Sequence, residues 1–243
     1  GDCRVVEGDY WYGGYIDASF GHFVTETMSR VWWHLQHYPN DYTAVFVPNP
    51  ASPELSAWQR EIFDYFKIDR LFLVDEPTTF QNMVIPQQGG LLFSDEHDPE
   101  YRDALHDWNL DVQGPIEPGG KVFLTRPSKS SANVIGEARL AQCFADAGYR
   151  VFAPEEHSIA DQLRALRGAT HVAGVQGSAF HIFNLLGRSP ANILLFQRLG
   201  DFTGAKLTET VAPYVESVSL VPALVRFSDR AGSNHDATLI DTS

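Results

Sequence analysis

Residues Thr170–Asn184 read THVAGVQGSAFHIFN and combine a short apolar run, a turn of small residues and a second apolar run. We interpret Thr170–Val175 as a buried strand, Gln176-Gly177-Ser178 as a tight turn, and the residues around His181 as a helix. A helix that begins directly after a strand presents unpaired backbone N–H groups, and its dipole favours an anion there. Ser178 can cap this helix, and Gly177 lets a ligand approach the backbone closely. The stretch predicts a phosphate-binding turn or, alternatively, an ordinary strand-to-helix turn.

A similar succession of strand and helix patterns occurs before and after this stretch in the chain of 243 residues. Short apolar runs alternate with helix-like patterns, and several runs are continuously apolar, as in strands that are buried on both faces. This order predicts an α/β fold in which helices cover parallel sheets. The expected strands are Ala44–Pro48, Arg70–Val74, Met83–Pro86, Lys121–Arg126, Tyr149–Ala153, Thr170–Val175, Asn192–Gln197 and Ser217–Leu220. The expected helices are His22–His37, Pro53–Phe66, Pro99–Asp107, Ile135–Ala147, Ile159–Arg167, Ala179–Leu186 and Leu207–Ala212.

The segment Asp111–Gly120, DVQGPIEPGG, is rich in proline and glycine and is the best candidate for a linker. It divides the chain into an N-terminal domain, residues 1–115, and a C-terminal domain, residues 116–243. Each part is long enough to form a core of its own. Two α/β halves joined in this way place a ligand cleft between them.

The composition excludes several classes of protein. The net charge of −13 argues against a nucleic-acid-binding protein, which needs a basic surface, and against docking on anionic lipid by charge alone. Two cysteines, Cys3 and Cys143, give neither a disulfide framework nor a cysteine zinc site. No apolar run is long enough to span a membrane. The cytoplasm is the default location. Because the chain begins at Gly1, membrane association through a further segment or a partner stays open, as does oligomerisation.

A second informative stretch is Asp17–Trp33, DASFGHFVTETMSRVWW, in which a turn leads into a helix that is expected to start near His22. Glu26 follows His22 by four residues, so both side chains lie on one helix face. Neither core packing nor the helix dipole explains a histidine in the first helical turn. His22 is therefore a candidate general base, and Glu26 either orients it or is the base itself. The alternatives are a surface His–Glu pair and a metal site, for which no third ligand is evident.

Basic residues follow the expected strand Lys121–Arg126, which Pro127 stops. Arg126 and Lys129 then project from the carboxyl end of a strand, where α/β sheets bind their ligands. Arginine can hold a diphosphate through two parallel hydrogen bonds, and lysine adds a mobile charge. The two residues are candidates for a diphosphate site, with a solvated loop as the alternative.

The residues Pro154–Arg164 follow another expected strand. Ser158 and Asp161 have the spacing of a capping pair for the helix that follows. Glu156 stands before them, where a carboxylate can accept hydrogen bonds from ribose hydroxyls. A purely structural role for Glu156 is the alternative.

Taken together and in this order, these stretches resemble glycosyltransferase family 61, whose core was once catalogued as a domain of unknown function. The last motif has a form that is typical of bacterial members. Gln176 stands where eukaryotic members have a histidine, and Lys129 is the nearest basic residue where a second arginine often follows the first. The residues that carry the resemblance are Gly21-His22-Phe23, Glu26, Arg30, Phe123-Leu124-Thr125-Arg126, Gly136-Glu137, Glu156, Ser158, Gln162 and Gln176-Gly177-Ser178-Ala179-Phe180-His181.

The resemblance implies a GT-B-like architecture, in which two Rossmann-like domains of parallel sheet face each other across a cleft and the C-terminal one holds the donor. It also implies that a sugar moves with inversion from a nucleotide sugar, usually UDP-linked, to a glycan or polysaccharide acceptor. No metal or other cofactor is expected. The implied donor contacts are Arg126, Lys129, Glu156, Gln176, Gly177, Ser178, Ala179 and His181. The candidate bases are His22, Glu26 and Asp17.

Two other functions fit the same residues. A different sugar-nucleotide enzyme, such as a polysaccharide pyruvyl transferase or an epimerase, would keep the anion site and change the role of His22. A degenerate, non-catalytic module would bind a nucleotide or carbohydrate without turnover.

Overall fold

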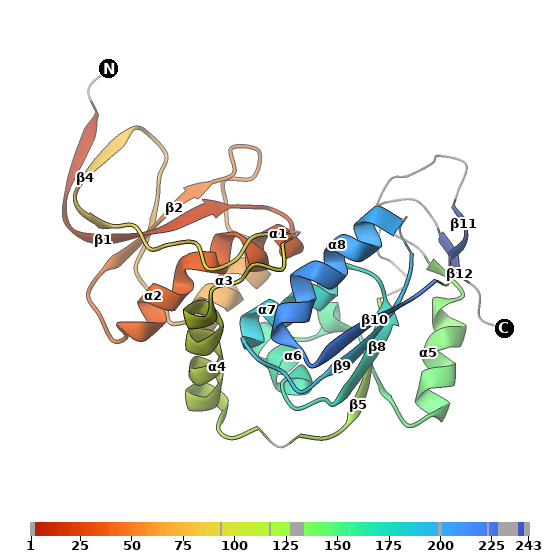
Figure 1. The fold of residues 1–243 in the computed structure, drawn as a ribbon. Coiled ribbons are helices and arrows are strands. Elements are labelled where there is room, and N and C mark those ends of the chain that lie inside the picture. The colour runs from red at the N-terminus through yellow and green to blue at the C-terminus, as the bar shows by residue number, and fades with distance from the viewer. Residues whose placement is uncertain are drawn as a thin grey trace.

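The computed structural model consists of two parallel β-sheets with their helices, placed side by side (Figure 1). Its N-terminal half carries a four-stranded sheet and its C-terminal half a five-stranded sheet. The α/β class with parallel sheets is confirmed. The structure describes residues 3–92, 94–116, 118–126, 134–198, 201–222, 224–227 and 238–240, with no side chains described at 201–204 or from 224 onward.

The N-terminal sheet has the strand order β3-β2-β1-β4, and every neighbouring pair is parallel. Its inner strand β1 is the longest, and β1 and β4 lie side by side near the N-terminus (Figure 1). The strands are β1 (Arg4–Ile16), β2 (Thr43–Pro48), β3 (Leu71–Leu73) and β4 (Thr78–Val84). The helices of this half are α1 (Phe20–Thr25), α2 (Val31–Gln36) and α3 (Ala57–Tyr65).

The strand β1 is absent from the sequence prediction. Its apolar pattern is broken by glycines, and the pairing register shifts between Val6 and Asp9 and between Tyr12 and Gly14. Gly8 and Gly14, at these shifts, have the positive φ angles of 118° and 125° that glycine tolerates. Bulges of this kind disrupt the regular alternation from which a strand is predicted.

The single helix expected over His22–His37 is wrong, because the chain forms α1, a 3-10 turn η1 (Thr27–Arg30) and then α2. Two hydroxyl side chains bond to nearby carbonyls: Thr25 Oγ1 donates to Gly21 O at 2.7 Å, and Ser29 Oγ donates to Glu26 O at 2.6 Å. Such bonds compete with a regular helix. The break falls beside Glu26, so it shapes the candidate site.

The C-terminal sheet has the order β10-β9-β8-β5-β7, again all parallel. The expected strands in this half are present, with ends that differ by a few residues. The strands are β5 (Lys121–Leu124), β7 (Arg150–Phe152), β8 (His171–Val175), β9 (Asn192–Phe196) and β10 (Ser217–Val221). The helices are α5 (Glu137–Asp146), α6 (Ile159–Leu166), α7 (Ile182–Leu186) and α8 (Asp201–Val211). A small sheet of β6 (Val134–Ile135), β11 (Leu224–Phe227) and β12 (Thr238–Ile240) stands apart.

Helices cover both faces of the C-terminal sheet. Phe123, Ala173 and Val175 pack under α5, and the alternate residues Val122 and Val172 belong to the main apolar core on the other face. On that second face α6 and α7 pack against the N-terminal half (Figure 1). The main core therefore runs without a break from the N-terminal half into the C-terminal half.

The helix α4 (Pro99–Gln113) contacts both halves, packing against α2 and α7. It begins at the cap residue Asp98 and continues beyond the expected end at Asp107 into the predicted linker. Arg167 donates hydrogen bonds to the carbonyls of Gly114 and Pro115, which ties the end of α4 to the C-terminal half. The first residues of the predicted linker are thus helical and fixed. The domain boundary at residue 115 and the GT-B arrangement stay predictions.

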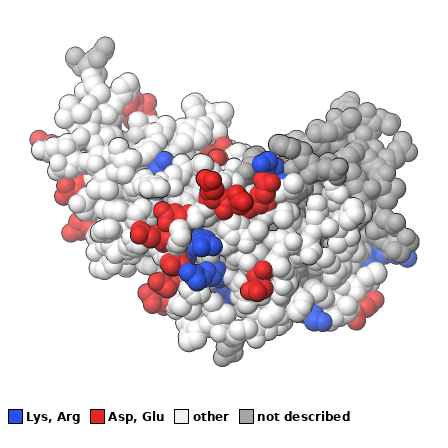
Figure 2. All heavy atoms as spheres, in the orientation of Figure 1, with Lys and Arg blue, Asp and Glu red and all other residues white. Residues whose placement is uncertain are grey.

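Acidic residues dominate the charge of the molecule. On the face that Figure 2 shows, acidic side chains gather where the two halves meet, with fewer basic side chains among them. This matches the net charge of −13. A buried cationic group therefore stands out in this structure.

Candidate functional site

The candidate site lies where the central strands of the two sheets end. β1 leads into α1, and β8 leads into the 3-10 turn η3 (Ser178–His181) and then α7. The two segments pack against each other, and a Cβ added at Gly21 would stand 2.7 Å from Cδ2 of His181. Ligands of open α/β sheets bind outside the carboxyl ends of the strands. The carboxyl ends of β1 and β8, one from each sheet, both lie at this junction.

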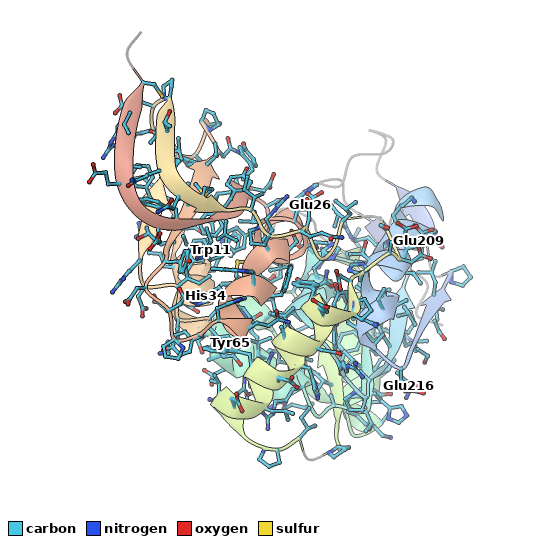
Figure 3. All side chains as sticks on the ribbon, turned by 60° about the vertical axis from the view of Figure 1, so that its left-hand side comes forward. Trp11, Glu26, His34, Tyr65, Glu209 and Glu216 are labelled. Carbon is cyan, nitrogen blue, oxygen red and sulfur yellow. The ribbon has the colours of Figure 1, made fainter. Side chains whose placement is uncertain are left out.

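The N-terminal half contributes the pair His22 and Glu26. His22 Nδ1 stands 2.6 Å from Glu26 Oε2, and the two side chains are 44% and 39% exposed. Figure 3 shows Glu26 at the junction of the halves, away from His34 and Tyr65. The predicted pairing on one helix face is present, and both groups can be reached from solvent.

Asp17 lies in the turn between β1 and α1. Its Oδ1 accepts hydrogen bonds of 2.7 Å from both the backbone N and the Oγ of Ser19. Partial burial opposes ionisation of Asp17, but the Ser19 bonds and the nearby His22 outweigh it and hold the carboxyl pKa below its ordinary value. Asp17 is thus a weak base whose carboxylate supports the turn.

The turn after β8 differs in part from its prediction. The cap position of η3 is Gly177, no side chain caps the turn, and Ser178 is its first residue, so the predicted capping role of Ser178 is wrong. The expected helix Ala179–Leu186 is a 3-10 turn followed by the five-residue α7. A helix this short has a weak dipole. An anion at this turn must therefore be held mainly by neighbouring cations.

Two arginines flank this turn. Arg126 follows β5 with a side chain that is 14% exposed, and Arg198, 5% exposed, follows β9. A Cβ added at Gly177 would stand 3.9 Å from Arg126 Nη1. The backbone N of Arg198 donates to Gln176 Oε1, and its Nε donates to Gln176 O, both at 3.2 Å. Arg126, Arg198 and Gln176 thus meet at the carboxyl edge of β5, β8 and β9.

Glu137, at the start of α5, is the carboxylate of this cluster. Its Oε1 accepts from Arg126 N at 2.9 Å, and its Oε2 stands 3.5 Å from Arg126 Nη2. Burial, and then the charge of Arg126, lower the pKa of Arg198 to about 10, while Glu137 acts in the opposite direction. Glu137 is thus close to both cations of the cluster. Sequence reasoning missed Arg198, although the Gln197-Arg198 pair that ends an expected strand was a usable signal.

His181 occupies the contact between the halves. It is 7% exposed, and burial, with a smaller contribution from His22, lowers the pKa of its imidazole to about 4. Its Nδ1 has no hydrogen-bond partner among the described residues. The structure thus places the imidazole of His181 against Gly21, and its predicted contact with the donor stays a prediction.

An open cavity of about 400 Å³ lies beside the turn, between α3 and α6, and we call it the α3–α6 cavity. Both halves line it. The lining residues are Phe20, Ala57, Trp58, Glu61, Pro154, Glu155, His157, Ile159, Gln162, Ser178 and Ala179.

Glu156 and Lys129 are the two remaining predicted donor contacts. Glu156, the last residue of the 3-10 turn η2 (Pro154–Glu156), is exposed, and the cavity is lined by its neighbours Glu155 and His157. Lys129 lies outside the described residues. Ser158 caps α6 as predicted, because its Oγ accepts from Asp161 N at 3.2 Å.

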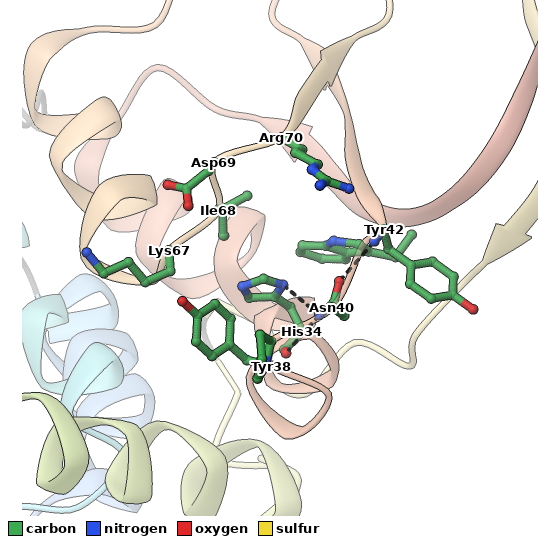
Figure 4. Close-up of a pocket in the computed structure, with 10 residues that line it drawn as sticks. His34, Tyr38, Asn40, Tyr42, Lys67, Ile68, Asp69 and Arg70 are labelled. Atoms are coloured by element: carbon green, nitrogen blue, oxygen red, sulfur yellow. Dashed lines mark hydrogen bonds between the residues drawn. The ribbon is translucent and has the colours of Figure 1, made fainter.

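A second, smaller cavity of about 190 Å³ lies in the N-terminal half and is called the amino-edge pocket here (Figure 4). Its loops precede β2 and β3, so it opens at the opposite edge of the sheet from α1. His34 Nε2 bonds to Phe66 O at 3.1 Å, and His34 Nδ1 stands 3.3 Å from Asn40 Nδ2. The ring stacks on Trp11, and burial lowers the pKa of His34. This is the pattern of a structural core histidine.

Comparison with known families fits this geometry. The family model described as Glycosyltransferase 61 matches residues 20–186, well over half of the chain. The chain belongs to glycosyltransferase family 61. The match runs from α1 to α7 and includes His22, Glu26, Arg126 and the turn after β8, whereas Arg198 lies beyond it. A search of curated proteins returned no match.

As a family 61 glycosyltransferase, the protein is an enzyme that acts on a nucleotide-sugar donor and an acceptor. Within the described ranges, no three His, Cys, Asp or Glu side chains cluster as metal ligands. Among the helices that the structure describes, none is long and apolar enough to cross a membrane.

Proposed function

We propose that this family 61 enzyme transfers a sugar with inversion from a UDP-linked donor to a hydroxyl of a glycan, and that arginines replace a metal ion at the diphosphate. The observation that carries the proposal is a pair of arginines, the partly buried Arg126 and the buried Arg198, beside the turn at Gly177. Two neighbouring guanidinium groups at the carboxyl ends of parallel strands form a site that suits an anionic ligand.

The position of the arginines supports a diphosphate ligand. β5 and β8 are neighbours in the sheet although β7 comes between them in sequence, so the strand order changes direction at this point. Such a switch point is where doubly wound sheets bind nucleotides. The guanidinium Nε of Arg126 is buried without a partner in the described part of the chain, and a phosphate oxygen can accept from it.

The electrostatics of the cluster favour an anionic leaving group. Burial makes the charged form of Arg198 costly, as its lowered pKa shows, and Arg126 adds repulsion. The carboxylate of Glu137 opposes this effect. As the bond from the sugar to the phosphate breaks, negative charge grows on the diphosphate, and preorganised cations stabilise it in the way that a metal ion does in other enzymes.

The base comes from the other half of the molecule. With the proton on Nδ1, His22 donates to Glu26, and its Nε2 can accept the proton of the acceptor hydroxyl. Glu26 orients the ring and stabilises the imidazolium that forms. The acceptor oxygen bonds to the anomeric carbon while the bond to the diphosphate breaks. A base in one half and a leaving-group site in the other suit a single displacement, which inverts the configuration.

A transfer assay tests the proposal. Purified enzyme with EDTA is incubated with a panel of UDP-sugars and mixed glycan acceptors, and products are read by mass spectrometry and the anomeric configuration by NMR. We expect a product one sugar larger than the acceptor, with the opposite configuration to the donor. Retention of configuration, a strict metal requirement, or an epimerised or pyruvylated product would contradict the mechanism.

A further inference from the structure

We propose that the α3–α6 cavity is the acceptor subsite of the enzyme and that it holds an uncharged sugar ring, an inference that rests on the proposed function. The cavity is large enough, at about 400 Å³, to hold such a ring, and it takes walls from both halves. Nothing in the donor site accounts for it. Its chemistry differs from that of the arginine cluster on the other side of the turn.

The N-terminal wall is aromatic. The ring of Trp58 packs edge-on against Phe20 and Phe23, with centroids 5.4 and 5.1 Å apart, and remains half-buried at the cavity wall. Held from two sides, this indole has little freedom to move. A fixed aromatic face is a good surface for the apolar face of a sugar ring, because it buries area at little cost in conformational entropy.

The C-terminal wall supplies a second ring and a fixed loop. The imidazole of His157 stacks on Phe152 with centroids 4.3 Å apart. Gln162 Nε2 donates to the carbonyls of Pro154 and His157 at 2.9 and 3.0 Å, which holds the loop before α6 in place. The cavity is therefore formed before a ligand arrives.

Among the described residues that line the cavity, the carboxylates are Glu61 and Glu155, and none is lysine or arginine. Glu61 Oε2 accepts from Ile159 N at 2.9 Å, so a residue of α3 also fixes the start of α6. Carboxylates accept hydrogen bonds from sugar hydroxyls and repel phosphate and uronic acid groups. This charge favours a neutral ring and disfavours a diphosphate.

The cavity also lies close to both the candidate base and the turn after β8. Ser178 and Ala179 of the turn line it, and Phe20 stands two residues before His22 on α1. A sugar in this cavity thus lies between the half that carries the base and the turn that faces the diphosphate. Much of the aromatic wall belongs to the half with His22, which favours the acceptor over the nucleoside of the donor.

The test combines an array of neutral and uronic-acid-containing oligosaccharides with calorimetric titration of UDP. Wild-type protein should retain neutral glycans. Trp58→Ala should weaken that retention by about tenfold or more, while Trp58→Phe keeps most of it. Glu155→Lys, at an exposed position, should move retention toward uronic acid glycans. UDP affinity should stay within about twofold in all three variants. Trp32→Phe, a half-buried tryptophan that does not line the cavity, is the matched control.

Two results would overturn the proposal: wild-type protein that retains no neutral glycan, or a Trp58→Ala variant that loses UDP affinity and keeps glycan retention. The latter would make the cavity a nucleoside site. If wild-type protein binds no UDP while glycan retention still depends on Trp58, the cavity assignment stands and the proposed transfer from UDP fails.

Discussion

The junction of the two halves and the amino-edge pocket both contain a buried histidine, but they differ in how many of their buried polar atoms have a hydrogen-bond partner. In the amino-edge pocket, both ring nitrogens of His34 have neighbours at hydrogen-bond distance. At the junction, His181 Nδ1, Asn184 Oδ1 and Arg126 Nε are buried without partners among the described residues. A buried polar atom without a partner lowers stability. Such atoms also occur along α4, at Tyr101, Arg102, His106 and Gln113, so the three at the junction point to a ligand only because they lie where α/β proteins bind ligands.

The largest effect should come from the exposed histidine at the junction. We expect His22→Ala to lower kcat by roughly 10²–10⁴-fold, because the acceptor hydroxyl loses its base, while donor affinity is retained. Single-turnover kinetics and calorimetry with the same preparation measure the two quantities. Loss of folding, or unchanged kcat, would remove His22 from the reaction.

The next effect concerns the cation beside the turn. Arg126→Ala should weaken nucleoside diphosphate binding by about 2 kcal/mol or more, because a buried charge-assisted contact is lost. Arg70→Ala, at the amino-edge pocket, is the matched control and should leave the affinity unchanged. Equal affinities for the two variants would sink the assignment of the diphosphate site.

The amino-edge histidine should behave in the opposite way to His22. His34→Ala removes two hydrogen bonds and a stacked ring, and we expect it to lower the free energy of unfolding by about 2–3 kcal/mol. The folded fraction should keep its kcat and KM. Urea unfolding and steady-state kinetics provide the comparison, and a selective loss of activity would show that the pocket takes part in function.

The last prediction concerns the dependence of stability on pH. His34 and His181 have lowered pKa values in the folded protein because burial disfavours the charged imidazole. The unfolded chain binds more protons below its histidine pKa of about 6.5. Stability should therefore be full above that pH and fall as the pH drops toward the His181 pKa of about 4. His34→Ala should reduce this slope, and urea midpoints across the range will show whether it does.

Much of the C-terminal half followed from the sequence, because its strands are short, continuously apolar and bounded by turn residues. The N-terminal half was harder to predict. Glycine bulges in β1 broke the alternation, and the hydroxyls of Thr25 and Ser29 interrupted the helix after His22. Neither the bulges nor the side-chain hydrogen bonds can be predicted from the local pattern of apolar residues.

Local sequence patterns also predicted only part of the candidate site. His22, Glu26 and Arg126 follow strand ends and could be named, and the structure brings His22 and Glu26 together at 2.6 Å. Arg198 joins Arg126 only through the strand order β5-β8-β9, which single-sequence patterns do not give. The α3–α6 cavity forms only because α3 and α6, which are far apart in the chain, pack against each other.

The central claim is that Arg126 and Arg198 hold the donor diphosphate without a metal ion. Calorimetric titration of UDP into the wild-type enzyme, once with EDTA and once with excess Mg²⁺ or Mn²⁺, tests it most directly. Our account predicts micromolar binding that is the same in the two titrations. Binding that appears only with the divalent ion would contradict it.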